Sequence, residues 1–118
     1  MSWKVTVRHG PEVKRERFAS LEGALGFARE AADRVRREGR LPDINALRDI
    51  PSDQRVHARI EVSGKGLLRG PEAGLDVKGD GSVVPYRGAI SKEPLEADSL
   101  DDAVARVREA LSGQAGRR

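Results

Sequence analysis

The strongest constraint on this fold is an alternation of apolar and polar residues with a period of two. The clearest run occupies residues 55–62: its apolar members are Val56, Ala58, Ile60 and Val62, and its polar members are Arg55, His57, Arg59 and Glu61. Successive side chains of a strand point to opposite faces of a sheet, so this run predicts a strand with one buried face. Trp3, Val5 and Val7 alternate with polar residues in the same way. The chain is therefore expected to cover one face of a sheet and to leave the other face polar.

Two other segments show the spacing of a helix. Apolar residues recur every three or four positions after Ser20 and again after Ser99. The first stripe comprises Leu21, Leu25, Ala28, Ala32 and Val35, and the second comprises Leu100, Val104, Val107 and Leu111. Serine is a favoured N-cap because its hydroxyl accepts a hydrogen bond from a free backbone N–H of the first turn. The spacing predicts two amphipathic helices that end at Gly39 and Gly113.

The remaining strands are predicted from shorter apolar runs between turn residues. Residues 13–18 return after a His-Gly-Pro turn, and residues 83–90 pair with a strand that contains Leu75 and Val77. Pro85 lacks a backbone N–H, which places the last strand at a sheet edge. We therefore predict an α+β fold: an about five-stranded, mostly antiparallel sheet with two helices on one face, in the order β-β-α-β-β-β-α. Residues 1–112 form a single domain in this prediction, and residues 113–118 form a short flexible basic tail.

The two predicted helices resemble each other in sequence. SLEGALGFAREA, from Ser20, and SLDDAVARVREA, from Ser99, are identical at six of twelve positions. Each follows a predicted hairpin, so the chain can be interpreted as two strand–strand–helix units with one extra strand between them. Convergence is the simpler explanation, because capped amphipathic helices share this sequence pattern.

A hairpin followed by S-L-E/D-x-A resembles many short bacterial hairpin–helix domains, including antitoxins of the HicB type. The whole chain is similar to small uncharacterised bacterial proteins that share a G-x-D-V-x-G-D-G segment, here Gly74 to Gly81. These resemblances imply an α+β sheet with helices and no particular activity. The element order from residue 20 to 111 also resembles the double-stranded-RNA-binding fold. That family grips phosphates with lysines at the start of its last helix, where this chain has Asp101 and Asp102.

Composition excludes several classes of protein. The 118 residues contain no cysteine, so neither disulfides nor thiolate metal sites can form. The first ten residues lack the apolar region of a secretory signal, and no apolar run approaches the roughly 20 residues that span a bilayer. The sequence therefore predicts a cytoplasmic protein without a membrane partner. Residues 1–40 carry ten basic and six acidic groups and residues 71–118 carry seven and nine, an asymmetry that permits acidic partners or self-association.

Two motifs that suggest ligand binding have simpler interpretations. The D-x-K-x-D-G run from Asp76 looks like the start of a calcium loop, but Lys78 and Arg87 stand at the third and twelfth positions, where the loop needs oxygen ligands. Its glycines favour a turn between two strands instead. The S-G-K-G run from Ser63 lacks the spacing of a phosphate-binding loop and is predicted to be a flexible connection. The sequence therefore predicts neither a metal nor another cofactor.

Catalytic and phosphate-binding groups are not indicated either. His9 and His57 are the only histidines, and no nucleophile pattern accompanies them, so the sequence does not predict an enzyme. The arginines of the first predicted helix suggest a phosphate-binding face when taken alone; they are Arg29, Arg34, Arg36, Arg37 and Arg40. Acidic residues four positions away, as in Arg29–Asp33, predict a solvated face of ion pairs instead.

The predicted sheet leaves one basic surface open. If both helices cover one face, the other face displays the candidate binding residues Lys4, Arg8, Arg55, His57, Arg59 and Arg87, diluted by Glu61 and Asp76. We predict a small non-enzymatic module that acts by protein–protein contact, either with a partner protein or by self-association into a homo-oligomer. The alternative is a nucleic-acid-binding accessory protein whose arginine-bearing face contacts phosphates. The chain's few aromatic residues, one Trp, one Tyr and two Phe, argue against a stacking platform for single strands.

Overall fold

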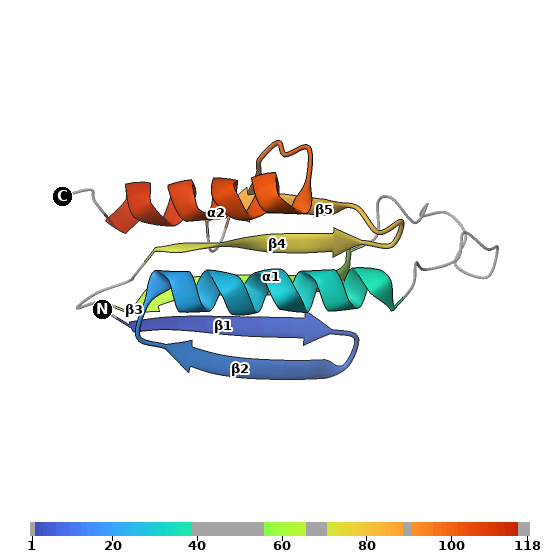
Figure 1. Cartoon of the computed structure of the whole chain (residues 1–118), viewed down its shortest axis with the longest axis horizontal. Coiled ribbons are helices and arrows are strands. Elements are labelled where there is room, and N and C mark those ends of the chain that lie inside the picture. The colour runs from blue at the N-terminus through green and yellow to red at the C-terminus, as the bar shows by residue number, and fades with distance from the viewer. Residues whose placement is uncertain (1, 39–55, 66–70, 89–90, 116–118) are drawn as a thin grey trace.

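The alternating runs form strands, and the segments with helical spacing form helices. A computed structural model describes residues 2–38, 56–65, 71–88 and 91–115. Its strands are β1 (Ser2–His9), β2 (Glu12–Phe18), β3 (Val56–Lys65), β4 (Glu72–Lys78), β5 (Val83–Arg87) and β6 (Glu93–Pro94), and its helices are α1 (Leu21–Arg37) and α2 (Leu100–Ala115). Both helices lie across the same face of one sheet (Figure 1). The predicted α+β fold is confirmed, with one strand more than expected.

All six strands are antiparallel to their neighbours, in the order β2-β1-β3-β4-β5-β6. β1 and β2 form a hairpin that is closed by Gly10 and Pro11, with His9 opposite Glu12. Gly10 has a φ of 62°, and the proline ring holds the next residue at a negative φ. A two-residue turn of this kind matches the twist of paired strands, so the Gly-Pro dipeptide sets the register of the hairpin.

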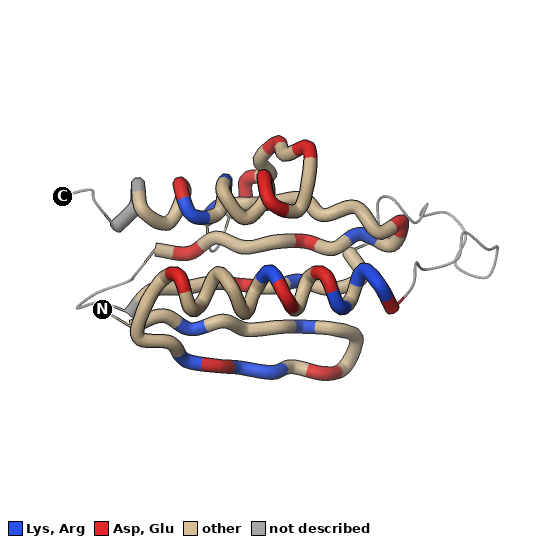
Figure 2. Tube along the Cα trace, in the orientation of Figure 1, with Lys and Arg blue, Asp and Glu red and all other residues tan. Residues whose placement is uncertain are grey.

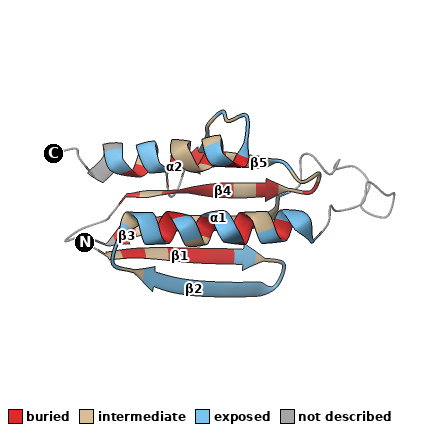
Figure 3. Cartoon of the chain, in the orientation of Figure 1, coloured by how far each residue is buried: buried red, intermediate tan, exposed pale blue. Residues whose placement is uncertain are grey.

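The core lies between the sheet and the two helices (Figure 3). The strands contribute the buried residues Val5, Val7, Ala58, Ile60, Val62, Ala73, Leu75 and Val77. The helices contribute Ala24, Leu25, Ala28, Ala31, Ala32 and Val35 of α1 and Leu100, Ala103, Val107 and Leu111 of α2. Directly opposite residues of an antiparallel pair share a face, and the register sets Val5 against Val62 and Ile60 against Leu75. The predicted apolar face of the sheet is therefore the face beneath the helices.

Both helices begin after the predicted serines. Ser20 Oγ accepts a hydrogen bond from the N–H of Gly23 at 3.0 Å, and Ser99 Oγ accepts one from the N–H of Asp102 at 3.0 Å. The Asp102 carboxylate accepts a hydrogen bond from the N–H of Asp98 at 3.1 Å. An aspartate at this position thus reaches the residue before the cap, whereas the longer glutamate of a capping box usually returns to the cap itself.

Two element boundaries differ from the prediction. α2 continues through Gly113 to its end, because a glycine inside a helix costs about 1 kcal/mol without stopping it. The predicted connection at residues 63–66 is strand as far as Lys65, and the N–H of Gly64 donates to the Pro71 carbonyl at 2.8 Å. Gly39, the expected end of α1, lies outside the described residues.

The far edge of the sheet is a further correction. Pro85 led us to expect β5 at the edge, but β6 pairs beyond it, and the N–H of Leu95 donates to the Pro85 carbonyl at 2.8 Å. The N and C=O groups of one strand residue point to the same side, so the proline nitrogen also faces β6 and not β4. Its missing hydrogen therefore affects only the short outer pairing. A two-residue strand is too short to show an alternation, which is why no pattern predicted β6.

The two similar helix sequences meet in one interface. Arg108 of α2 donates hydrogen bonds of 2.5 and 3.1 Å to Glu22 of α1, and Arg29 of α1 pairs with Asp101 of α2 rather than with Asp33. In the aligned stretches Glu22 corresponds to Asp101, and Arg29 corresponds to Arg108. The two helices are antiparallel, so each helix contributes the acidic residue of one ion pair and the equivalent arginine of the other. The shared sequence therefore has a structural role, whether duplication or convergence produced it. Neither described helix is long and apolar enough to cross a membrane.

Candidate interaction surface

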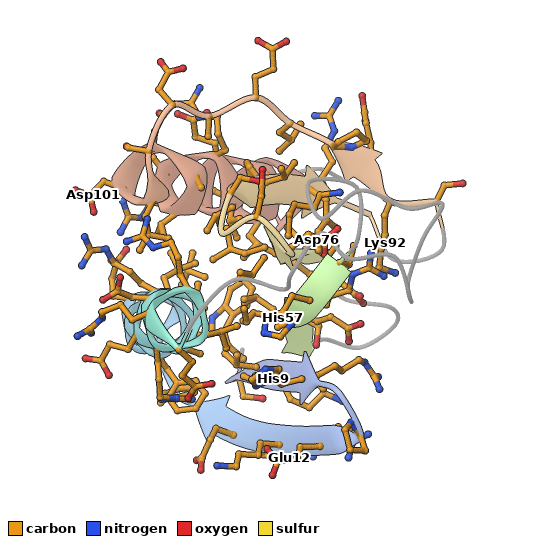
Figure 4. The ribbon with its side chains drawn as sticks, turned by 90° about the vertical axis from the view of Figure 1, so that its right-hand side faces the viewer. His9, Glu12, His57, Asp76, Lys92 and Asp101 are labelled. Atoms are coloured by element: carbon orange, nitrogen blue, oxygen red, sulfur yellow. The ribbon has the colours of Figure 1, made fainter. Side chains whose placement is uncertain are left out.

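The open face is the face of the sheet that neither helix covers. By strand alternation its charged and aromatic residues are Lys4 and Arg8 of β1, Arg15 and Arg17 of β2, Arg59 and Glu61 of β3, Glu72, Asp76 and Lys78 of β4, and Tyr86 of β5. Figure 4 views the sheet along its strands, with both helices on one side and side chains projecting from the other. The polar face that the sequence predicted therefore exists as one surface.

Three predicted binding residues line one hollow at the end of the sheet where β1 and β3 are paired. Arg8, His57 and Arg59 line a shallow hollow of about 340 Å³, which also includes Gly10. Lys4 lies further along β1 and is half-buried. These four residues come from β1 and β3, which are neighbours in the sheet although about fifty residues separate them in sequence. Arg55, the fifth of the predicted residues, lies outside the described part of the chain.

Arg87 does not belong to the open face. It stands directly opposite Ala73, whose side chain is fully buried beneath the helices, so Arg87 starts on the helix side of the sheet. Its guanidinium instead pairs with Glu93 of β6, with Nε 2.8 Å from the carboxylate. The preceding residue, Tyr86, occupies the open face. The sequence prediction was therefore displaced by one residue at this strand, and a displacement of one residue changes the face.

Acidic neighbours neutralise the two best-placed arginines of the open face. Arg59 donates two hydrogen bonds to the Asp76 carboxylate, at 2.6 and 3.1 Å, and these bonds raise the pKa of Arg59. Arg8 donates one hydrogen bond to Glu61 at 3.2 Å. A fork-shaped guanidinium that holds a carboxylate in this way has fewer free donors for a phosphate. The sequence indicated that Glu61 and Asp76 dilute the positive charge of this face. The structure shows that their carboxylates also form ion pairs with Arg8 and Arg59.

The sequence reasoning missed two basic residues of this face. Arg15 and Arg17 are exposed on β2, and Arg17 lies directly opposite Lys4. None of the three forms an ion pair with another described residue. We call Lys4, Arg15 and Arg17 the basic strip. The signal that could have found it is the Gly-Pro turn: a two-residue loop sets His9 against Glu12 and thereby assigns every second residue of β2 to the open face.

Acidic residues gather on the neighbouring strands of the same face. We call Glu61, Glu72 and Asp76 the acidic strip; they lie on β3 and β4. Burial, and then the nearby Glu61 carboxylate, raise the pKa of Glu72. Burial also raises the pKa of Tyr86, and all three carboxylates of the acidic strip add to that effect. The open face is therefore electrically divided, with a basic side over β1 and β2 and a more acidic side over β3 and β4.

Tyr86 is the largest buried side chain on the open face. Only 2% of its surface is exposed, and it stands opposite Gly74 of β4. The Arg59 guanidinium carbon lies 5.5 Å and Lys92 Nζ 5.7 Å from the ring centroid, which is within cation–π range. Among the described residues its hydroxyl has no hydrogen-bond partner. The ring thus forms an apolar anchor on the acidic side of the open face, beyond the two strips, and its buried hydroxyl has no partner among the described residues.

The raised pKa of Tyr86 predicts a loss of stability at high pH. In the unfolded chain this tyrosine ionises near pH 10, whereas in the folded chain it ionises only at higher pH. The buried neutral ring therefore contributes fully to the free energy of unfolding below about pH 10, and this contribution is lost as pH rises. We expect the free energy of unfolding to fall by up to about 1.4 kcal/mol per pH unit above that point, and this component to vanish in Tyr86→Phe. Urea unfolding at several alkaline pH values checks it.

The absorbance of the tyrosinate ion provides the contradicting outcome for this titration. Tyr86 is the only tyrosine of the chain, so the near-ultraviolet signal belongs to it alone. Tyrosinate should appear together with unfolding. If it appeared near pH 10 in protein that is still folded, the ring would be accessible to water and the burial described above would be wrong.

The two histidines meet at the end of the sheet where β1 and β3 are paired. A bulge between Val56 and Ala58 interrupts the alternation of β3, and His57 turns toward His9 (Figure 4). Their ring centroids are 4.7 Å apart with planes at 78°, and the two Nε2 atoms are 3.2 Å apart. One Nε2 must carry a hydrogen and donate it to the other. His57 is therefore a structural contact of the hairpin as well as a lining residue of the hollow.

The calcium-like segment forms a turn, as predicted. Asp80 Oδ1 accepts hydrogen bonds from the N–H of Ser82 at 2.9 Å and from Ser82 Oγ at 2.7 Å, and Gly81 has a φ of 92°. The first acid of the motif, Asp76, points to the open face and binds Arg59. Asp80 therefore stabilises an Asx-type turn, and Asp76 forms an ion pair.

No protein-family model, curated protein or solved structure matches this chain. The open face is consequently the feature from which a function can be argued. Its arrangement suits recognition: two strips of opposite charge lie side by side on the sheet, and a buried aromatic ring packs beside the acidic one. The arginines are held in place by carboxylates, so the charge pattern is fixed before any partner arrives.

Proposed function

We propose that this protein is a non-enzymatic interaction module that binds a protein partner through the open face of its sheet. The observation that carries the proposal is the division of that face into a basic strip and an acidic strip. Protein interfaces are commonly built from complementary patches of both signs, which select the partner and set its orientation. A partner with an acidic patch beside a basic one would match the two strips together.

A polyanion fits this surface less well. Phosphates attracted by Lys4, Arg15 and Arg17 would also approach Glu61, Glu72 and Asp76 on the adjacent strands, and like charges repel across such distances at ordinary salt. Arg8 and Arg59, the arginines nearest these acids, already hold carboxylates. The same features that weaken phosphate binding supply a protein partner with acceptors as well as donors.

The basic strip nevertheless favours one alternative function. Its three side chains lie on the two adjacent strands β1 and β2 and form no ion pair with another described residue, and such a basic patch is a footprint of nucleic-acid binding. The alternative is an accessory protein that grips phosphates with the outer half of the open face. It predicts binding that weakens steeply with salt, whereas a divided protein interface depends on salt only moderately.

A matched pair of charge-reversal variants tests the proposal. Lys4→Glu/Arg8→Glu reverses two charges on the open face. Arg34→Glu/Arg37→Glu reverses two exposed charges on α1, so the net charge of the chain changes equally in both variants. Each chain is immobilised and used to capture proteins from its native extract, and the captured proteins are compared by mass spectrometry. We expect partners that are retained by wild type and the α1 variant but lost at least tenfold with the open-face variant.

Two outcomes would contradict this function. Equal capture by both variants would place the binding site elsewhere on the molecule. Fluorescence anisotropy against random duplex DNA, duplex RNA and single-stranded RNA at about 50 and 200 mM salt examines the alternative. Tight binding that collapses over this range, and that only the open-face variant loses, would establish the nucleic-acid function instead. A cytoplasmic location is part of the proposal, and cell fractionation tests it.

A further inference from the structure

β2 is an exposed strand at the edge of the sheet. Residues 12–17 are all exposed, and β2 is coloured as exposed along most of its length in Figure 3. Within the described residues β1 is its only strand partner, so its outer side presents unpaired N–H and C=O groups. Val13, at 41% exposure, adds one of the exposed large apolar side chains. An edge of this length is a template for pairing with another strand unless its side chains prevent it.

The hairpin turn determines which backbone groups of β2 are free. In a two-residue hairpin the closing pair, here His9 and Glu12, exchanges hydrogen bonds, and such pairs then recur at every second residue. Glu12, Lys14 and Glu16 therefore point their backbone groups at β1, whereas Val13, Arg15 and Arg17 point theirs outward. The same alternation continues across the sheet: the N–H of Lys78 in β4 and the N–H of Leu95, the residue after β6, point as it requires. Only three residues can thus bond to an added strand.

Charge selects one register for antiparallel pairing of two β2 strands. Full overlap sets Arg15 opposite its own copy, and it sets Lys14 opposite Glu16 twice, once on each side. A shift of two residues in one direction instead sets Lys14 against itself and Glu12 against Glu16. A shift in the other direction sets Glu16 against itself and Arg15 against Arg17. A shift of one residue would set residues whose backbone groups face outward opposite residues whose backbone groups face β1, so the hydrogen bonds could not form. A shift of four residues would leave only three residues of each strand paired.

We propose that two copies of this chain associate through β2, antiparallel and in register about a two-fold axis at Arg15. The two six-stranded sheets then form one continuous sheet, and Lys14 of each copy meets Glu16 of the other. Figure 2 shows both signs of charge along β2, which this arrangement uses. The inference goes beyond the proposed function, because it concerns the edge of the sheet and a second copy. A monomer could still bind a partner protein through the open face.

The central pair of the dimer is its weakest point. Two Arg15 side chains stand opposite each other on the open face, and like charges in that position oppose pairing. Arg15→Thr removes the repulsion and suits a strand, so we expect it to tighten association by about two- to fivefold. Arg15→Pro removes the outward N–H while leaving the inner side of β2 intact, and we expect it to abolish association. One position therefore gives changes in opposite directions, which sedimentation velocity measures.

Single cysteines identify the register. The chain has no cysteine, so each variant carries one reactive site. In the proposed register the two Cα atoms of Arg15→Cys lie about 5.5 Å apart, within disulfide range, whereas the Cα atoms of Lys14→Cys or of Glu16→Cys in the two copies lie too far apart. We expect rapid disulfide-linked dimer for Arg15→Cys, little for the other two, and none above collision level for Arg34→Cys on α1. Preferential cross-linking at Lys14→Cys or Glu16→Cys would overturn this register in favour of one shifted by two residues.

Charge reversal supplies an independent test. Lys14→Glu and Glu16→Lys each convert both Lys–Glu contacts into like-charge contacts, and we expect each to weaken association about tenfold or more. The double variant Lys14→Glu/Glu16→Lys restores opposite charges and should restore the dimer. A monomer at about 100 µM in wild type and in Arg15→Thr alike would overturn the proposal and would show that the charges of β2 protect the edge. The capture assay with the open-face variants can still be carried out on that monomer. Failure of the dimer proposal is therefore distinguishable from failure of the proposed function.

Discussion

Replacing Gly74 by alanine should lower the free energy of unfolding by about 3 kcal/mol. A Cβ at this position would lie 2.2 Å from the Ile60 carbonyl oxygen and 2.6 Å from the Tyr86 hydroxyl oxygen. The first contact is with the backbone of β3, which cannot move without breaking its pairing with two neighbouring strands. The added methyl group therefore forces a shift in the middle of the sheet. Urea unfolding followed by fluorescence measures the change, since Trp3 is buried and is the only tryptophan.

Gly26→Ala is the matched control for this substitution. A Cβ at Gly26 meets no atom within 4 Å, and the position lies inside α1. Alanine favours a helix over glycine by about 1 kcal/mol, so this variant should be more stable than wild type. Opposite signs for the same chemical change would show that the effect at Gly74 comes from its neighbours. A Gly74→Ala protein as stable as wild type would mean that the Ile60 carbonyl and the Tyr86 ring do not approach Gly74 as closely as described.

Truncating Tyr86 to alanine should cost about 4 kcal/mol, because it removes the largest buried side chain of the open face and leaves a cavity over Gly74. Tyr86→Phe should behave differently. Its ring keeps the packing and the contacts with Arg59 and Lys92, and it loses a buried hydroxyl that has no partner among the described residues. Removing an uncompensated buried polar atom is expected to leave stability unchanged or to raise it by about 1 kcal/mol.

Comparison of the two Tyr86 variants in urea separates packing from polarity. If Tyr86→Phe were destabilised as strongly as Tyr86→Ala, the hydroxyl would have a hydrogen-bond partner, and its surroundings would differ from those described. If Tyr86→Ala were nearly neutral, the ring would contribute little, and the open face would lack its apolar anchor. In either case capture assays on the same proteins would show whether the ring also contributes to partner binding.

The fold was largely predictable because its elements obey local rules. The period-two runs of β1 and β3 and the capped stripes of α1 and α2 each identify an element without reference to the rest of the chain. Pairing of adjacent hairpin strands follows from the two-residue turn at Gly10 and Pro11. β6 could not be predicted, because a two-residue strand is defined only by its partner. The extent of β3 was underestimated because its last residues resemble a glycine-rich loop.

The open face was predictable only in part, because strand register decides it. Lys4, Arg8 and Arg59 were assigned correctly from alternation alone. Arg87 was assigned to the wrong face. Alternation along β5 shows which residues share a face, but only the register with β4 shows which of the two faces that is. The ion pair between Arg59 and Asp76 joins residues on two strands, and no spacing within one strand indicates it. Long-range packing of Tyr86 over Gly74 is equally invisible in a single sequence.

The order of the strands also has a kinetic consequence. The β1–β2 hairpin and the β3–β4–β5 meander pair residues that are close in sequence, whereas the ladder between β1 and β3 joins residues roughly fifty to sixty apart. Closing that ladder requires the largest loss of chain entropy before its contacts form. The central pairing of the sheet is therefore the step expected to limit the rate of folding, although the two units that it joins can each assemble quickly. Truncation at Val5 or Val62 should slow refolding, whereas changes at the outer strands should mainly accelerate unfolding.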